Sequence, residues 1–365
     1  MDSRKSGNGN NIWDIRVDNM IDNYSWYWWW WIFFIRDPEN PGRPKQLMIL
    51  WSTKSTDFIK VMDKEWSLKE KPEWDGNHLD LEGMVAAWWY DGEKMEDPLF
   101  LEEADMSVEK NNDEGILKTD VEGSEYSLSG DPDGYTVKID DPDNDFFFEL
   151  TPLNDYLSDH RYKENRYTKK YGYNIMKIYG MKLSGKIDGK EVQGTAYFQR
   201  VCVDAPATPW YWGLVHCEDG SFLQYFNPFI GPQMFRTKKD QRSFLDWGDI
   251  SLSKSILFYH KGTDKQYKLE SIDIQKELKD GLPTFRVTGQ EDGKKISISL
   301  RAYSRAFWRF QQKRRFGMKQ IFYYNEYPAE ILDFSFESVE DSLKLEKEDI
   351  GEMYGNFEHS WGKLF

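Results

Sequence analysis

The sequence predicts an all-β protein with few helices, built from two similar β-domains. Asp-Gly pairs separate alternating apolar runs at 91–92, 133–134, 188–189, 219–220 and 292–293. This pair suits type I′ turns because both central residues need a positive φ, so it is a strong hairpin signal. Aromatic residues, which suit a pleated sheet, make up 16% of the chain. The third observation is a set of strand motifs that occurs in both halves.

The first predicted strand is SWYWWWWIFFI, at 25–35. It is too short to cross a bilayer as a helix, which takes about 20 apolar residues. The acidic residues at 14, 18 and 22 also differ from the basic start of a secretory leader. No other stretch is long enough to span, so we expect no integral membrane segment and a cytoplasmic protein. Side chains alternate along a strand, so Trp26, Trp28 and Trp30 share one face, and both faces must be covered or one must line a cavity.

An internal repeat predicts the domain organisation. Each half opens with Trp-Tyr-Trp, at 26–28 and at 210–212. The halves close on similar strands, GTAYFQR at 194–200 and GNFEHSW at 355–361. We therefore expect an N-terminal β-domain over residues 1–203 and a C-terminal β-domain over residues 204–365. They join near VCVDAPATP, where two prolines mark a linker.

Two hairpins are especially clear, at 181–198 and 284–303. After the second, basic residues recur every four positions from Arg301 to Lys313, which predicts one helix over 305–319. Within it, FWRFQQKRRF interleaves aromatic and basic side chains. That pattern can bind single-stranded RNA or anionic lipid, but in an acidic protein a solvated helix face or a lid over a pocket is the alternative.

Charge and cysteine content exclude several function classes. The 48 Lys and Arg residues against 63 Asp and Glu give a net charge of −15, whereas nucleic-acid binding needs a basic surface. Cys202 and Cys217 are expected to remain thiols in a reducing cytoplasm. With five scattered histidines and two cysteines, no metal-ligand spacing is present. We predict no nucleic acid, no metal and no cofactor; no motif predicts an oligomeric state.

Three short motifs carry a resemblance to a known family. They are GTAYF at 194–198, Trp-Tyr-Trp at 210–212 and Cys-Glu-Asp-Gly at 217–220, and the Trp26 strand is a fourth, N-terminal match. Together they resemble proteins of the carotenoid 1,2-hydratase type, a lipocalin-like family that includes fungal Diels–Alderases and kievitone hydratase. The resemblance implies two lipocalin-like barrel or sandwich domains packed together. It also implies a pocket, in or between them, for an extended lipophile such as an isoprenoid or polyene.

The chain departs from the family at one functional position. Where the family has an Asp-His-Glu triplet, this sequence has Gln199, Arg200 and Val201. Chemistry that depends on the triplet is therefore not implied. Arg200 at this place could hold the carboxylate or phosphate headgroup of a lipid-like ligand, or pair with Asp204.

Proton delivery to an alkene starts both hydration of a C=C bond and cyclisation of a polyene. It needs a carboxylic acid that an apolar environment keeps protonated, and aromatic faces can then stabilise the carbocation. Glu358, in YGNFEHSWG, is the first candidate and Glu326, in IFYYNEYP, the second; either could instead be a solvated carboxylate. His359 could orient Glu358, although adjacent residues on a strand face opposite sides, or serve as a structural histidine.

The remaining candidates would bind the ligand. His216 lies on the same face of its strand as Trp212, and a satisfied structural histidine is the alternative. The aromatic candidates come from the repeat strands and the closing motifs: Trp26, Trp28, Trp30, Tyr197, Trp210, Trp212 and Trp361.

Three functions remain open at this level. The first is a hydratase or cyclase, of the lyase or isomerase class, that uses Glu358 or Glu326 as acid. The second is a non-catalytic lipophile carrier, and the third is a protein-interaction module whose aromatic residues only form a core. A water-shielded carboxylate that faces a pocket would distinguish the enzyme from the carrier.

Overall fold

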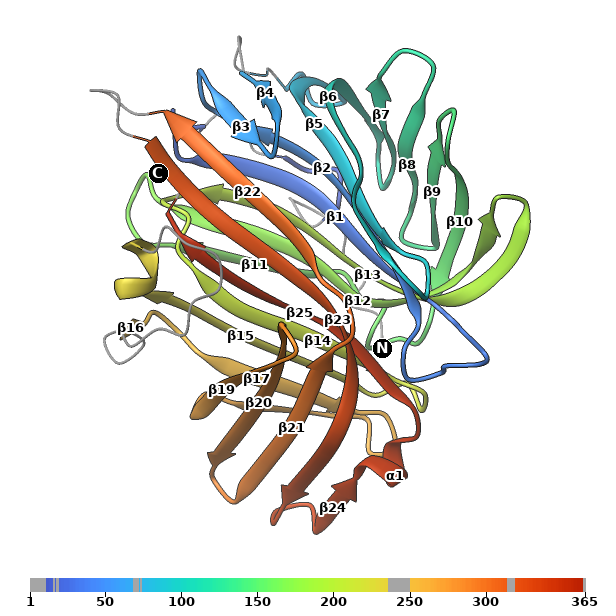
Figure 1. Ribbon diagram of the computed structural model, residues 1–365, viewed down its shortest axis with the longest axis vertical. Coiled ribbons are helices and arrows are strands. Elements are labelled where there is room, and N and C mark those ends of the chain that lie inside the picture. The colour runs from blue at the N-terminus through green and yellow to red at the C-terminus, as the bar shows by residue number, and fades with distance from the viewer. Residues whose placement is uncertain are drawn as a thin grey trace.

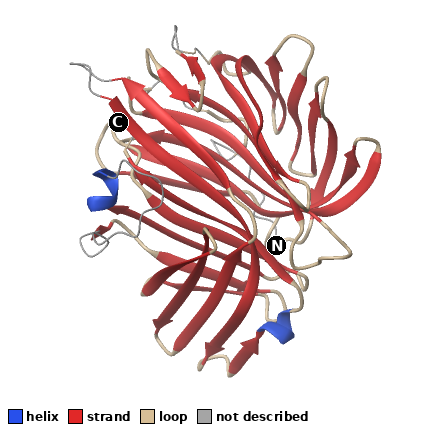
Figure 2. Cartoon of the chain, in the orientation of Figure 1, coloured by secondary structure: helices blue, strands red, loops and turns tan. Residues whose placement is uncertain are grey.

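The computed structural model describes residues 11–15, 17, 20–67, 72, 74–235, 250–313 and 319–363. Strands form almost all of its regular structure (Figure 2), which confirms the all-β prediction. The helical pieces in this part of the chain are one turn of 3₁₀ helix, Pro232–Phe235, and α1, Lys347–Ile350. No helix of the described residues has the length and apolar character that a membrane crossing requires.

The first sheet has eleven strands in the order β10-β9-β8-β7-β6-β5-β2-β1-β13-β12-β11. β10 also pairs with β12, which closes the strands from β10 to β12 into a barrel (Figure 1). The bounds are β1 Ser25–Ile35, β2 Lys45–Lys54, β5 His78–Tyr90, β6 Met95–Asn111, β7 Glu114–Asp120, β8 Glu125–Asp131, β9 Gly134–Asp140, β10 Asp145–Pro152, β11 Arg161–Arg166, β12 Gly172–Ile187 and β13 Lys190–Asp204.

The second sheet has fourteen strands, nine of them in the order β18-β17-β15-β14-β25-β23-β21-β20-β19. Its end strands β18 and β19 follow one another in the chain, and β18 also contacts β20, the neighbour of β19. The sheet therefore curls back on itself. The bounds are β3 Ile59–Val61, β4 Lys64–Trp66, β14 Trp210–Cys217, β15 Phe222–Ile230, β16 Ile250–Ser251, β17 Ser255–His260, β18 Lys265–Leu269, β19 Ile272–Lys279, β20 Leu282–Glu291, β21 Lys294–Ala302, β22 Ala306–Lys313, β23 Lys319–Ser338, β24 Leu343–Glu346 and β25 Met353–Gly362.

The repeated sequence motifs occupy equivalent places. β1 lies between β13 and β2, and β14 lies between β25 and β15. One exchange breaks this symmetry, because β3 and β4 come from the first half of the chain but pair with β22 of the second sheet.

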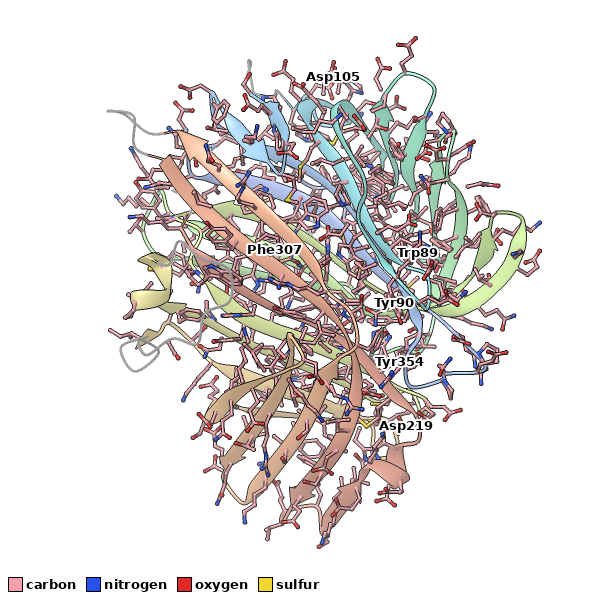
Figure 3. The ribbon with its side chains drawn as sticks, viewed as in Figure 1. Trp89, Tyr90, Asp105, Asp219, Phe307 and Tyr354 are labelled. Atoms are coloured by element: carbon pink, nitrogen blue, oxygen red, sulfur yellow. The ribbon has the colours of Figure 1, made fainter. Side chains whose placement is uncertain are left out.

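Alternation along β1 produces two separate apolar layers. Tyr27, Trp29 and Trp31 belong to the core inside the first barrel, while Trp26 and Trp30 belong to a second core between the two sheets. A third core fills the inside of the second sheet. The unbroken aromatic run is thus buried on both faces because each face packs against a different layer. The two sheets meet at Tyr90 of β5, which packs on Tyr303 at 5.1 Å, and at Tyr354 of β25, whose hydroxyl lies 3.2 Å from the Thr195 hydroxyl of β13; both tyrosines are labelled in Figure 3.

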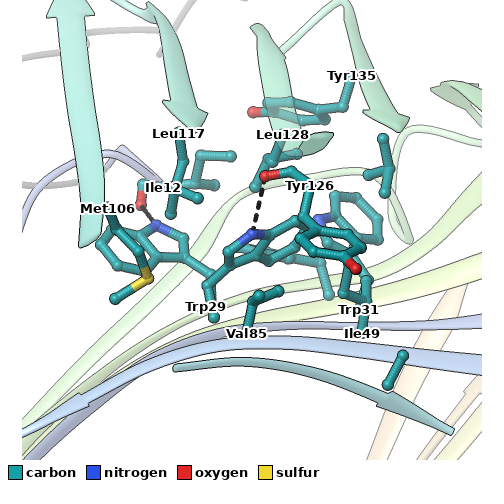
Figure 4. Packing of buried hydrophobic residues seen from close by; sticks show 14 of the residues in the cluster. Ile12, Trp29, Trp31, Ile49, Val85, Met106, Leu117, Tyr126, Leu128 and Tyr135 are labelled. Atoms are coloured by element: carbon teal, nitrogen blue, oxygen red, sulfur yellow. Dashed lines mark hydrogen bonds between the residues drawn. The ribbon is translucent and has the colours of Figure 1, made fainter. Parts of the chain in front are cut away.

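The N-terminal segment fills the lumen of the first barrel. Ile12 and Trp13 are fully buried there, and Trp29 donates a hydrogen bond from Nε1 to the Ile12 carbonyl at 2.8 Å (Figure 4). Trp13 also packs so closely on Gly115 that a Cβ there would lie 2.5 Å from the indole. The chain's own residues therefore occupy the space that a ligand would take in an open barrel.

The predicted hairpins are present at all five Asp-Gly pairs. At the two clearest, both central residues have a positive φ: 49° and 73° at Asp188 and Gly189, and 47° and 72° at Asp292 and Gly293. This is the backbone that type I′ turns require. No disulfide joins Cys202 and Cys217.

The predicted helix at 305–319 is wrong. Residues 306–313 form β22, which pairs with both β23 and β3. Trp308, Phe310 and Gln312 are buried and the residues between them are half-buried, which is the period of a strand. A spacing of four is also a multiple of two, so basic residues at that spacing share a strand face as readily as a helix face. The rest of the segment, at 314–318, lies outside the described residues.

Candidate functional site

A cavity lies in the apolar layer between the two sheets, and we call it the interface cavity. It is lined by Trp26, Trp28, Trp30, Met48, Leu50, Gln199, Trp210, Trp308, Phe310, Tyr324 and Glu358. Its volume is about 60 Å³, which equals the space that about two water molecules occupy in the liquid. Trp28, Leu50 and Trp210 on its wall are only half-buried, so the cavity reaches the surface. A larger ligand has to displace side chains of this wall.

Glu358 brings a carboxyl group to this apolar wall. It lies on β25 and is 4% exposed. Trp210 donates to its Oε2 from Nε1 at 2.5 Å, and the Tyr324 hydroxyl lies 2.8 Å from its Oε1. Burial raises the pKa of Glu358 to about 7, against the opposing effects of these hydrogen bonds and of the Lys177 charge.

Glu326 lies directly opposite Glu358 on the neighbouring strand β23. It is fully buried, and it accepts hydrogen bonds from the Trp88 indole nitrogen and, at 2.5 Å, from the Tyr324 hydroxyl. Burial raises the pKa of Glu326 well above its usual range, and the nearby Glu358 charge raises it further. Glu326 does not line the cavity and lies behind Glu358, in the protein interior.

The hydroxyl of Tyr324 requires the pair to hold a proton. It lies within hydrogen-bond distance of both carboxyl groups but has a single hydrogen to donate. The second contact is satisfied when the other carboxyl is protonated and donates to the hydroxyl oxygen. Two like charges in this buried site would also be costly. The triad of Glu358, Tyr324 and Glu326 is therefore a proton-holding group with one member in the cavity wall.

His359 faces away from Glu358, as adjacent strand residues do. Its ring stacks on Tyr211 at 4.5 Å on the inner side of the second sheet, and Lys276 Nζ lies 3.2 Å from Nδ1. Trp361, two residues on, shares that side and stacks on Tyr323 at 5.3 Å. Neither His359 nor Trp361 lines the interface cavity.

Three other predicted ligand residues lie in the layer between the sheets but outside the cavity wall. Trp212 and Tyr197 each pack on Trp30, with ring centroids 5.5 Å and 5.7 Å away. His216 contacts the Thr195 hydroxyl through Nδ1 at 2.7 Å and donates from Nε2 to the Tyr179 carbonyl at 2.8 Å. Burial lowers the pKa of His216 to about 4, so it is a neutral, satisfied histidine.

Arg200 lies in neither of its two expected places. It is 1% exposed and shares the inward face of β13 with Cys202, whose sulfur is 3.9 Å from Nη1. Its neighbour Gln199 takes the cavity face instead. The expected pairing with Asp204 is absent: Asp204 accepts hydrogen bonds from Ser25 at 2.6 Å and Tyr27 at 2.7 Å.

The structure thus brings together Trp26, Trp28, Trp30, Trp210, Glu358 and, behind them, Glu326. Sequence reasoning missed Tyr324 and Lys177. A signal existed for Tyr324, which shares a strand face with Glu326 two residues later. None existed for Lys177, which faces the cavity layer from β12 and donates to Gln224 Oε1 at 2.9 Å. In the part of the chain that the structure covers, no three His, Cys, Asp or Glu side chains gather as a metal site would require.

No family model and no curated protein matches the chain, but its fold is similar to solved structures. CghA has a TM-score of 0.54 at 10% identity over 94% of this chain and 90% of CghA. CghA with Sch210972 has 0.51 at 9% identity over 93% and 89%. Kievitone hydratase from Nectria haematococca has 0.44 at 8% identity over 92% and 88%, a score too low to support an argument. The likeness to CghA establishes the lipocalin-like fold alone.

Proposed function

We propose that this protein binds an unsaturated lipophile, isoprenoid- or polyene-like, in the interface cavity and protonates one of its C=C bonds with Glu358. The activity would be that of a hydratase or cyclase. The observation that carries the proposal is the proton-holding triad, because it places a shielded carboxyl group, with a pKa near 7, in a wall of indole rings. A pKa near the working pH is what an acid catalyst needs.

In the proposed step the Glu358 proton and the π electrons of the alkene form a new C–H bond. The positive charge left on the other alkene carbon lies among Trp26, Trp30 and Trp210, whose faces attract cations. Hydration is completed when water adds to that carbon and gives a proton back to the Glu358 carboxylate. Cyclisation is completed when a second C=C of the same molecule adds to that carbon and the resulting cation returns a proton to the Glu358 carboxylate. Tyr324 and Glu326 support either route by holding Glu358 in place.

The size of the cavity sets a condition on binding. Burying about 500 Å² of an apolar chain contributes on the order of 12 kcal/mol gross, and micromolar affinity needs about 8 kcal/mol net. The free-energy costs of association and of displacing wall side chains must therefore stay below the difference between these two values, about 4 kcal/mol. Trp28 and Leu50, which are half-buried, are the side chains we expect to move, since Trp210 is held by its hydrogen bond to Glu358. CghA, which shares the fold, has been solved with the compound Sch210972.

A carrier is the second candidate, and a specific observation favours it. Gln199 and Arg200 stand where the resembled family has catalytic residues, and Arg200 points away from the cavity. A carrier would need the aromatic wall but not the acid. If the protein is a carrier, neither the wild type nor a Glu358 variant would convert the ligand, and both would bind it equally well.

The test starts with organic extraction of protein purified from its own host and mass spectrometry of the extract. A stoichiometric lipophile supplies the substrate, which is then incubated with the protein in D₂O. We expect deuterium in a C–H bond of the product with the wild type and at least a hundredfold less with Glu358→Gln. Glu191→Gln, whose side chain is 78% exposed, is the matched control. A bound lipophile that takes up no deuterium would favour the carrier, and a clean extract would favour a packed aromatic core with a protein partner.

A further inference from the structure

One row of residues crosses the first sheet on the face that meets the second. The register pairs Lys177 of β12 with Gln199 of β13, Gln199 with Trp30 of β1, and Trp30 with Leu50 of β2. Gln199, Trp30 and Leu50 all line the interface cavity. Directly opposed residues on antiparallel strands have Cβ atoms about 5 Å apart, so Lys177 lies one strand beyond the cavity wall and its side chain can reach the cavity's edge.

Lys177 has no carboxylate partner among the described residues. Its ammonium group donates to the neutral Gln224 amide, and no acidic side chain of the described chain lies within 4.0 Å of it. The acid whose charge acts on Lys177 is Glu358, and burial raises the pKa of Glu358 to about 7. On the other side, β12 pairs Lys177 with Arg161 of β11, whose guanidinium lies 3.8 Å from Asp159. Burial and, in addition, the charge of Lys163 lower the pKa of Lys177, so a negative group beside Lys177 would be favoured.

Gln199 adds a second donor beside the ammonium group. Its Oε1 lies 3.4 Å from the Tyr197 hydroxyl, and no group of the described residues accepts from its amide nitrogen. An ammonium group next to an unused amide N–H matches a carboxylate, which has two acceptor oxygens and one charge. A doubly charged phosphate is usually bound by several cationic side chains, whereas this site offers one close cation.

We propose that the ligand is an amphipathic carboxylic acid, with its carboxylate against Lys177 and Gln199 and its unsaturated chain in the interface cavity. This inference rests on the proposed function and names the class of its substrate. The carboxylate restores a charged partner to Lys177, whose pKa burial now lowers to about 7. It also fixes the chain in one direction, so that the same C=C bond meets Glu358 in every molecule.

Binding of cis-parinaric acid and of its methyl ester tests the proposal, since this polyene fluoresces when it enters an apolar site. We expect the wild type to bind the acid about tenfold more tightly than the ester, the worth of one charge-assisted hydrogen bond. In Lys177→Met the two affinities should become equal because the ester affinity is kept and the acid affinity falls. Lys186→Met is the control, because Lys186 lies on the same strand, is 55% exposed and pairs with Glu191 at 3.4 Å.

The outcomes distinguish the carboxylate site at Lys177 from the binding of the lipophile itself. Equal binding of acid and ester by the wild type would overturn the carboxylate and leave the lipophile site in place. A preference for the acid that persists in Lys177→Met would overturn the role of Lys177. Failure of both probes to bind the wild type would overturn the proposed binding of polyenes itself. The ester affinity of the variant, which does not depend on Lys177, reports whether the site still folds.

Discussion

The proton held by Glu358 should make the protein's stability fall as the pH rises. The pKa of this carboxyl group increases from an ordinary 4.5 to about 7 in the folded protein. Since the folded pKa is the higher one, the stabilising contribution is complete below pH 4.5 and is lost as the pH rises to about 7. Between pH 5 and pH 8 the change covers about two pH units, at about 1.4 kcal/mol each. Glu358 should therefore cost the folded state about 3 kcal/mol over this range.

Glu358→Gln removes the titration but keeps an oxygen that Trp210 and Tyr324 can reach. Urea unfolding, followed by tryptophan fluorescence at several pH values, gives the free energy of unfolding for both proteins. The wild type should lose about 3 kcal/mol more than the variant between pH 5 and pH 8. Glu191→Gln, an exposed change, should follow the wild type. Parallel pH profiles for wild type and Glu358→Gln would refute the claim that the buried carboxyl retains its proton.

Three further predictions concern the structure around the site. Tyr324→Phe removes the hydroxyl shared by the two carboxyl groups and should lower the free energy of unfolding by about 1–3 kcal/mol. Thermal denaturation measures this loss, and an unchanged midpoint would contradict it. Trp13→Ala should cost about 3–5 kcal/mol, and Gly115→Ala about 1–3 kcal/mol in the wild type but much less in the Trp13→Ala background, because the added methyl then has room. A double-mutant cycle with zero coupling would oppose this packing. His216 should remain neutral from pH 5 to pH 8 because burial lowers its pKa to about 4, and a midpoint inside that range in an NMR titration of its ring nitrogens would contradict it.

Local sequence signals were sufficient for the strands and their turns. Asp188-Gly189 and Asp292-Gly293 take the positive φ angles that their residue types favour, and the alternation of the Trp26 strand holds along its whole length. These features depend on neighbouring residues, which is why composition and periodicity predict them. The same reasoning failed at 305–319, because a spacing of four positions fits a strand face as well as a helix.

The site, in contrast, depends on contacts between distant residues. Glu326 and Glu358 face each other because β23 and β25 adopt one register, and a shift by one residue would have turned one of them to the other side. Sequence composition determined an all-β chain and two candidate acids with aromatic neighbours. Tertiary structure alone decided that the first barrel is filled by its own N-terminal segment and that the cavity lies between the sheets. It also decided that Tyr324 contacts Glu358 and that the charge of Lys177 acts on Glu358. Register and sheet packing are non-local, and no pattern within a single strand encodes them.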